Sequence, residues 1–243
     1  MKTHAAFLLL ALWVCHFPSQ AMQAWPAPDL PASMQLTAAG QDIEINGLPV
    51  QMHVFTAKTS SQELTQSLRQ RLGPQLVTNQ LGAQTILGTP IGPQGHYLTI
   101  QIYPMGAQSK GIVAISQPVQ WREKQADSQI QRQHWQNLLP TETALLSHQT
   151  SRDHTVQSEQ IIYRNPHSLA YNTQHLVRLL HRQGMVLERM SQPAPTAHLQ
   201  HVPSTAQLLF FKGPQQSAVA TVHDQDRQTY IVLQMDRQPG PRP

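Results

Sequence analysis

The stretch from Asn165 to Met235 constrains the fold most, because its pattern predicts one helix followed by β-strands. Asn165-Pro166 predicts the start of the helix, since Asn can cap free amides and Pro needs no donor at the first helical position. Gly184 predicts its left-handed end. The apolar residues that recur between them at helical spacing are Leu169, Leu176, Val177 and Leu180.

β-rich runs follow the predicted helix up to Met235. They cover Met185–Met190, Leu208–Lys212 with Ala218–Val222, and Tyr230–Met235. Gly213-Pro214 and Asp224-Gln225-Asp226 are turn signals between them. This half of the chain is therefore expected to be one helix on a small antiparallel meander.

The first half contains a similar order of elements. Asp42–Ala57 predicts a β-hairpin, because Asn46-Gly47 is a favoured two-residue turn between alternating apolar residues. Ser60 and Glu63 form a capping-box pattern. The helix predicted after it carries Leu64, Leu68 and Leu72 and ends at Gly73-Pro74, and three strand-like runs follow, Gln75–Leu87, His96–Tyr103 and Gly111–Ser116.

The predicted fold class is α+β, in two small modules at 42–117 and 141–236. Leu145–Arg164 holds two β-like runs, so each module has a β-hairpin, one helix and an antiparallel β-meander. This equal order suggests an internal duplication. Chance recurrence of a common order is the alternative, because residue identity between the halves is low.

The remaining segments connect or flank these modules. Residues 22–41 are proline-rich and predict an extended lead-in, and 237–243 predict a disordered tail. The Gln-rich linker 118–140 has helical spacing in part. Trp121 and Trp135 within it are candidate partner-contact residues; the alternative is that they attach the linker to one of the modules.

The N-terminal residues predict a secretory signal peptide over 1–21. Lys2 precedes the apolar run Ala5–Cys15, and Ser19-Gln20-Ala21 supplies small residues before a cleavage site. The run is too short to cross a bilayer. We therefore expect an exported protein, periplasmic or secreted, although lipidation at Cys15 is an alternative to its removal.

Composition excludes several classes of function. Cys15 is the only cysteine, so the cleaved chain would have no disulfide and no thiolate chemistry. A net charge of +4, with 12% charged residues, gives little basis for nucleic-acid binding. No later apolar run is long enough for a transmembrane segment.

Motifs for catalysis or cofactors are missing from the sequence. Among 13 histidines the closest pair with metal-ligand spacing is His198-x-x-His201, which has no carboxylate beside it. Gly106–Gly111 matches neither a nucleophile elbow nor a phosphate loop. We expect no metal and no cofactor, and the sequence identifies no catalytic residue.

The leading hypothesis is a non-enzymatic exported protein that binds another cell-envelope component, with an assembly or accessory role. An exposed edge strand could accept a strand of that partner. The alternative is a hydrolase-type enzyme whose His/Asp site lies in the groove between the two modules.

Overall fold

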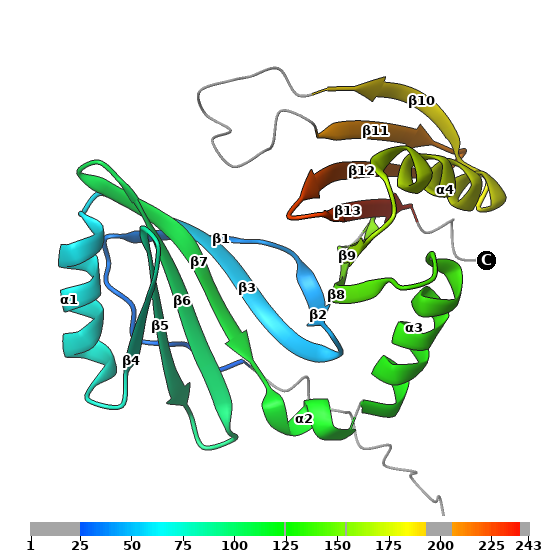
Figure 1. Ribbon diagram of the computed structural model, residues 1–243. Helices are drawn as coiled ribbons and strands as arrows, with labels where there is room; N and C mark the ends of the chain where they lie inside the picture. Colours follow the sequence, from blue (N-terminus) through cyan, green and yellow to red (C-terminus); the bar gives the residue numbers. More distant parts are fainter. Residues whose placement is uncertain (1–24, 124, 154, 193–205, 239–243) are drawn as a thin grey trace, which may run out of the picture.

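The computed structural model describes residues 25–123, 125–153, 155–192 and 206–238. They form an α+β fold with a 13-stranded antiparallel sheet, which confirms the predicted class (Figure 1). The elements of the first half are β1 (Met34–Ala38), β2 (Gln41–Ile45), β3 (Leu48–Ala57), α1 (Ser61–Leu72), β4 (Val77–Leu81), β5 (Gln84–Ile91), β6 (His96–Met105) and β7 (Gln108–Ser116). After them come α2 (Pro118–Glu123), α3 (Gln125–Leu138), β8 (Ala144–Arg152), β9 (Gln157–Asn165), α4 (Leu169–Arg182), β10 (Val186–Ser191), β11 (Gln207–Lys212), β12 (Gln216–Gln225) and β13 (Gln228–Arg237).

Strand order is the same in the two halves of the sheet. It runs β2-β3-β7-β6-β5-β4 in the first half and β8-β9-β13-β12-β11-β10 in the second. In the first half α1 follows β3, and β7 returns to pair with β3. In the second half α4 follows β9, and β13 returns to pair with β9. Pairing of β2 with β8 joins the halves into one sheet, and β1 pairs with β3 beside β2.

Each half has its own cluster of buried side chains. In the first half, Leu64 and Leu68 of α1 pack on residues that include Phe55 and Leu98. The second cluster is built around Ile161. The helix residues that join it are Trp135 of α3 and Leu176, Leu179 and Leu180 of α4. The clusters share no buried residue, so the described chain contains two separate hydrophobic cores.

Strand register places both cores on the same face of the sheet. Residues paired across an antiparallel ladder share a face, as do alternate residues of one strand. Phe55 therefore shares a face with Pro49 of the same strand. Pro49 pairs with Glu44 of β2, and Glu44 pairs with Thr150 of β8, so these residues lie on that face too. Thr150 in turn shares that face with His148 and its partner Ile161. Helices α1, α3 and α4 all supply residues to these cores and thus pack on this one face, and no described core residue of these helices lies on the other.

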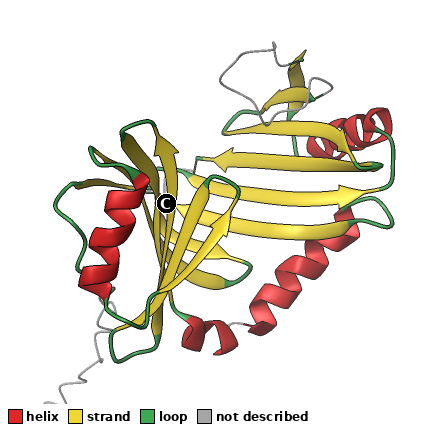
Figure 2. Ribbon diagram, turned by 60° about the vertical axis from the view of Figure 1, so that its left-hand side comes forward, coloured by secondary structure: helices red, strands yellow, loops and turns green. Residues whose placement is uncertain are grey.

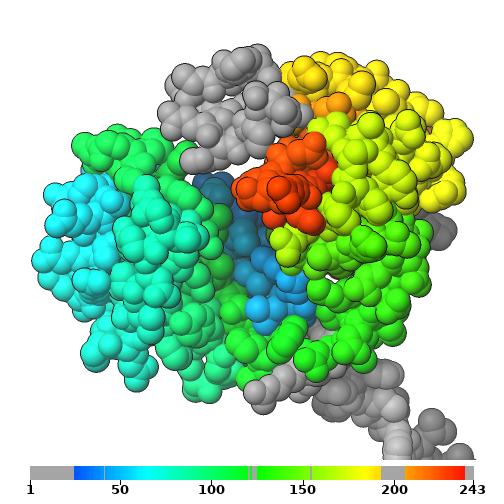
Figure 3. Space-filling view, viewed as in Figure 1, coloured from blue at the N-terminus to red at the C-terminus, as the bar shows by residue number. Residues whose placement is uncertain are grey.

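We call the other face of the sheet the bare face. In Figure 1 the sheet bends strongly where β2 meets β8, with α1 outside the first half and α4 outside the second, and Figure 2 shows the bent sheet turned by 60°. Figure 3 shows a hollow between the halves, with the blue residues of β1–β3 in its depth. The bare face consequently lines a concave surface.

Several local predictions are confirmed. Asn46-Gly47 forms the turn between β2 and β3, with positive φ at both residues. Ser60 accepts a hydrogen bond from the Glu63 backbone amide, and the Glu63 carboxylate accepts one from Ser60 N. Gly184 follows α4 with a φ of 81°. These features depend on neighbouring residues only.

Other boundaries were wrong. Helix α4 is capped by Ser168, whose hydroxyl accepts from Tyr171 N, whereas Asn165 ends β9. The run Gln75–Leu87 is split by a turn at Gly82 into β4 and part of β5, so four strands follow α1. The segment 22–41, by contrast, was predicted only to be extended, and strand β1 lies within it.

Three predicted features fall wholly or partly on residues that the structure does not describe. The predicted signal peptide, His198 and His201 lie outside the described residues, and so does most of the predicted tail, from 239 onward. Within the described chain, no helix is long and apolar enough to cross a membrane.

Candidate functional site

The β2–β3 turn is held at the junction of the two halves by three different elements. The Asn46 carbonyl accepts hydrogen bonds from Trp121 Nε1 at 3.2 Å and Ser128 Oγ at 3.1 Å. Asn46 Oδ1 accepts from His148 N at 3.0 Å, and Asn46 N donates to His148 O at 2.7 Å. Gly47 is required beside it, because a Cβ there would lie 2.5 Å from Ser128 Cβ. This turn therefore fixes α2, α3 and β8 around one backbone position.

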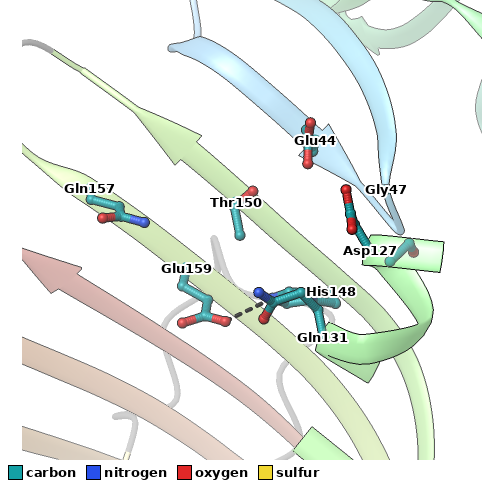
Figure 4. A pocket seen from close by; sticks show the side chains of 9 residues that line it. Glu44, Gly47, Asp127, Gln131, His148, Thr150, Gln157 and Glu159 are labelled. Carbon is teal, nitrogen blue, oxygen red and sulfur yellow. Dashed lines mark hydrogen bonds and ion pairs between the residues drawn. The ribbon is translucent and has the colours of Figure 1, made fainter. Parts of the chain in front are cut away.

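A polar cavity of about 330 Å³ lies at this junction (Figure 4). β2 and its turn, the start of α3, and strands β8 and β9 form its walls. It is lined by Glu44, Gly47, Asp127, Ser128, Gln131, His148, Thr150, Gln157 and Glu159. We call it the junction pocket. Figure 4 shows His148 and Glu159 directed toward each other on its wall.

Glu159 is an acid of the junction pocket that is hydrogen-bonded from two side chains. Its Oε1 lies 2.7 Å from His148 Nε2 and 2.8 Å from Trp135 Nε1. Burial alone would raise the pKa of Glu159, but the hydrogen bonds from His148 and Trp135 and the nearby positive charge of Arg237 lower it overall. The carboxylate is therefore ionised at neutral pH and can only accept hydrogen bonds, so His148 Nε2 carries a proton and donates a hydrogen bond to Glu159.

The geometry bears directly on the hydrolase alternative. The junction pocket does bring Ser128, His148 and Glu159 together between the halves. The hydroxyl of Ser128, however, donates to Asn46 O, and among the described residues no hydrogen bond joins Ser128 to His148. A serine nucleophile needs its base as the hydrogen-bond acceptor. The described residues also hold no group of three or more His, Cys, Asp or Glu placed to bind a metal ion.

A second cavity, of about 410 Å³, lies on the bare face of the first half. β1, β3, β6 and β7 form its walls, and apolar surface predominates in it. Its lining residues are Gln35, Thr37, Val54, Phe55, Thr56, Tyr103, Lys110, Gly111 and Ile112. We call it the bare-face pocket. Val54 and Tyr103 are 45% and 37% exposed, which is high for side chains of their size at the centre of a sheet.

Strand β1 forms one side of the bare-face pocket and has a free edge. Within the described chain it pairs only with β3. Its sequence Met-Gln-Leu-Thr-Ala contains no charge and no proline, and its register with β3 has no bulge. Charged residues, prolines and bulges normally protect an edge strand from pairing with another chain, and β1 has none of them. A peptide strand could therefore extend the sheet here and place side chains in the pocket.

The two tryptophans predicted as partner contacts have different environments. Trp135 is 3% exposed and belongs to the core of the second half, with its Nε1 on Glu159. Trp121 of α2 is 38% exposed, and its Nε1 is bonded to Asn46 O. The segment 118–140 is largely helical, as α2 and α3, and both tryptophans attach it to the rest of the chain.

Sequence reasoning did not single out His148, Glu159 or the residues of the bare-face pocket. His148 and Asn46 are 102 positions apart, and no spacing rule connects them. Alternation did place Val54 within a strand, but not on a face that helices leave bare. Both sites depend on which strands pair, and the pattern of a single strand carries no such signal.

No known protein family, no characterised protein and no solved structure shows significant similarity to this chain.

Proposed function

We propose that this chain is a non-enzymatic exported protein that binds an extended segment of another cell-envelope protein on the bare face. The segment adds a strand to the free edge of β1 and places a side chain in the bare-face pocket. Backbone hydrogen bonds supply affinity in this mode of recognition, and the pocket supplies selectivity.

The observation that carries this proposal is a strand edge that no other described strand pairs with, beside an apolar cavity on the bare face. Contiguous apolar patches exposed on a protein surface often mark binding sites, whereas single exposed apolar residues are ordinary. Here Val54, Tyr97, Tyr103 and Met105, all exposed, share the bare face by register.

The proposed export rests on the leader pattern of residues 1–21. Sequencing the N-terminus of the protein purified from its own cells should yield a chain that begins at or near Met22. A chain that retains Met1 would contradict export, and fatty acylation at Cys15 would place the protein on a membrane surface.

We also propose that the two halves arose by internal duplication. The equal strand orders, and a helix at the same position in each, support this origin. A duplicated unit that once folded alone should keep a core of its own, and the two separate clusters agree with that expectation. The unfolding experiment that opens the Discussion tests the independence of these cores.

Site-specific photocrosslinking in the cells that make the protein tests the binding proposal. A photoreactive amino acid replaces Val54 on the bare face or, as the control, Tyr171 on α4, which is 41% exposed. A discrete adduct from position 54 that is absent from position 171 is expected. No adduct at 54, or equal adducts at both positions, would overturn the proposal.

A second candidate function is hydrolysis in the junction pocket. The His148–Glu159 pair favours it, because a carboxylate that orients a histidine can help the ring to take a proton from water. The expected activity is slow hydrolysis of a simple ester such as p-nitrophenyl acetate, lost in His148→Asn and retained in His134→Asn. His134 is an exposed histidine of α3. Equal rates in both variants would remove this candidate.

A further inference from the structure

The charges on the bare face are biased toward cations. Register assigns four basic strand residues and one acidic strand residue to it: Lys110, Arg164, Arg189 and Lys212, and Asp236. The whole chain has 17 basic and 13 acidic residues. Glu188 lies in the β10 bulge, where register assigns it to neither face. The concave surface is therefore more positive than the protein as a whole, and attracts anionic groups.

The single acid of this face is already occupied by neighbouring donors. The Asp236 carboxylate accepts from Ser158 Oγ at 2.6 Å and from Gln234 Nε2 at 3.1 Å. These donors lie on the neighbouring strand β9 and on β13 itself. Asp236 is consequently engaged within the sheet, but both donors are neutral and do not cancel its charge, so the formal balance of the bare face is four basic residues against one acidic residue.

The cations remain available to a ligand. The Arg189 guanidinium lies 4.3 Å from the ring centre of Phe210, which positions the group without neutralising its charge. Among the described residues, the Arg164 guanidinium makes only one long hydrogen bond, 3.4 Å from its Nη1 to the Tyr230 hydroxyl. Lys110 is exposed on the wall of the bare-face pocket, and its ammonium group has no ionic or hydrogen-bonded partner within the described chain.

Resting on the proposed function, we infer that the segment bound at β1 is acidic, with a carboxylate two residues from a large apolar side chain. Residues i and i+2 of a strand stand on the same face. The apolar side chain then meets the β1 side of the bare-face pocket, beside Gln35 and Thr37, and the carboxylate two residues away faces the pocket that Lys110 lines from β7. The other cations of the bare face strengthen the attraction at longer range.

Three labelled eight-residue peptides test this inference against the full-length protein by fluorescence anisotropy. Each carries Phe at a central position, and the residues two positions away on both sides are Glu, Gln or Lys. Exposed ion pairs contribute about 0.2–1 kcal/mol each, so with two Glu residues we expect the Glu peptide to bind roughly twofold to thirtyfold tighter than the Gln peptide. The Lys peptide should bind weakest. High salt should reduce the preference for Glu.

Matched charge variants locate the effect. Lys110→Gln should weaken the Glu peptide by roughly twofold to fivefold and leave the Gln peptide unchanged. Arg178→Gln removes one positive charge from exposed α4 and should leave the affinities of the Glu and Gln peptides unchanged. Equal affinity of the Glu and Gln peptides, or equal losses in the two variants, would overturn the acidic segment while strand binding stands. Failure of all three peptides to bind would count against the proposed function itself.

Discussion

Replacing one buried leucine in each core tests whether the two halves unfold independently. Leu68 of α1 and Leu180 of α4 are both 0% exposed, and they belong to different core clusters. A fully buried Leu→Ala change costs about 2–5 kcal/mol through lost transfer free energy and the cavity left behind. For a unit of roughly 100 residues, each kcal/mol lowers the midpoint temperature by about 4–8 °C. Either variant should thus lower one midpoint by about 10 °C or more.

Differential scanning calorimetry of the full-length chain measures these shifts. If the cores are independent, Leu180→Ala moves one transition and Leu68→Ala moves the other, while each leaves the remaining transition nearly in place. Leu81→Ala, at a position in β4 that is 66% exposed, is the matched control and should move neither. One cooperative transition, shifted as a whole by both core variants, would show that the continuous sheet unfolds as a single unit and would refute this reasoning.

Three further changes have outcomes that the contacts determine. Gly47→Ala should cost about 1–3 kcal/mol in urea unfolding, because the residue has a φ of 76° and the new Cβ meets Ser128; an unchanged midpoint would contradict the packed turn. Because the pKa of folded Glu159 is lowered, its contribution to stability is present above its ordinary value of 4.5 and is lost as pH falls through the folded value. Glu159→Gln should therefore flatten the acid limb of a stability-versus-pH curve, and an unchanged limb would count against the bonds from His148 and Trp135. Burial raises the pKa of Tyr163, whose hydroxyl has no partner among the described residues, so Tyr163→Phe should leave the free energy of unfolding unchanged or raise it; a clear loss would reveal a bond to that hydroxyl.

The parts of the fold that could be predicted from the sequence depend on adjacent residues. Asn46-Gly47 specifies a tight hairpin turn because both residues tolerate positive φ. Ser60 and Glu63 satisfy each other's backbone amides three positions apart. Both features would form in almost any tertiary context, so a short window of sequence is enough to predict them.

The start of α4 was misplaced because two polar residues compete for the same role. Asn165 Oδ1 does accept from His167 N, as a residue just before a helix often does. Its amide nitrogen, however, donates to buried Asn172, and the cap is made by Ser168 three residues later. Asn172 is fully buried, and this partner was not predictable from residue type.

The residues of the candidate sites could not be predicted, because their positions follow from strand pairing over long separations. Alternation predicted that Val54 lies in a strand, yet its exposure depends on every helix packing on the opposite face. Trp135 stood out as an unusual residue in a linker. Its indole reaches Glu159, 24 positions away, only because β8 and β9 lie under α3.

The junction also determines the shape of the surface that the proposed partner meets. Without the β2–β8 ladder the halves would be two separate sheets, and the bare face would not be continuous. That ladder pairs few residues and contains an irregularity, so its hydrogen bonds alone fix the angle between the halves weakly. The bonds of Asn46 to Trp121, Ser128 and His148 supply the missing constraint from the helix side. The hydrogen bonds beside the junction pocket therefore hold the bend, and the bare-face pocket lies on the concave surface that the bend creates.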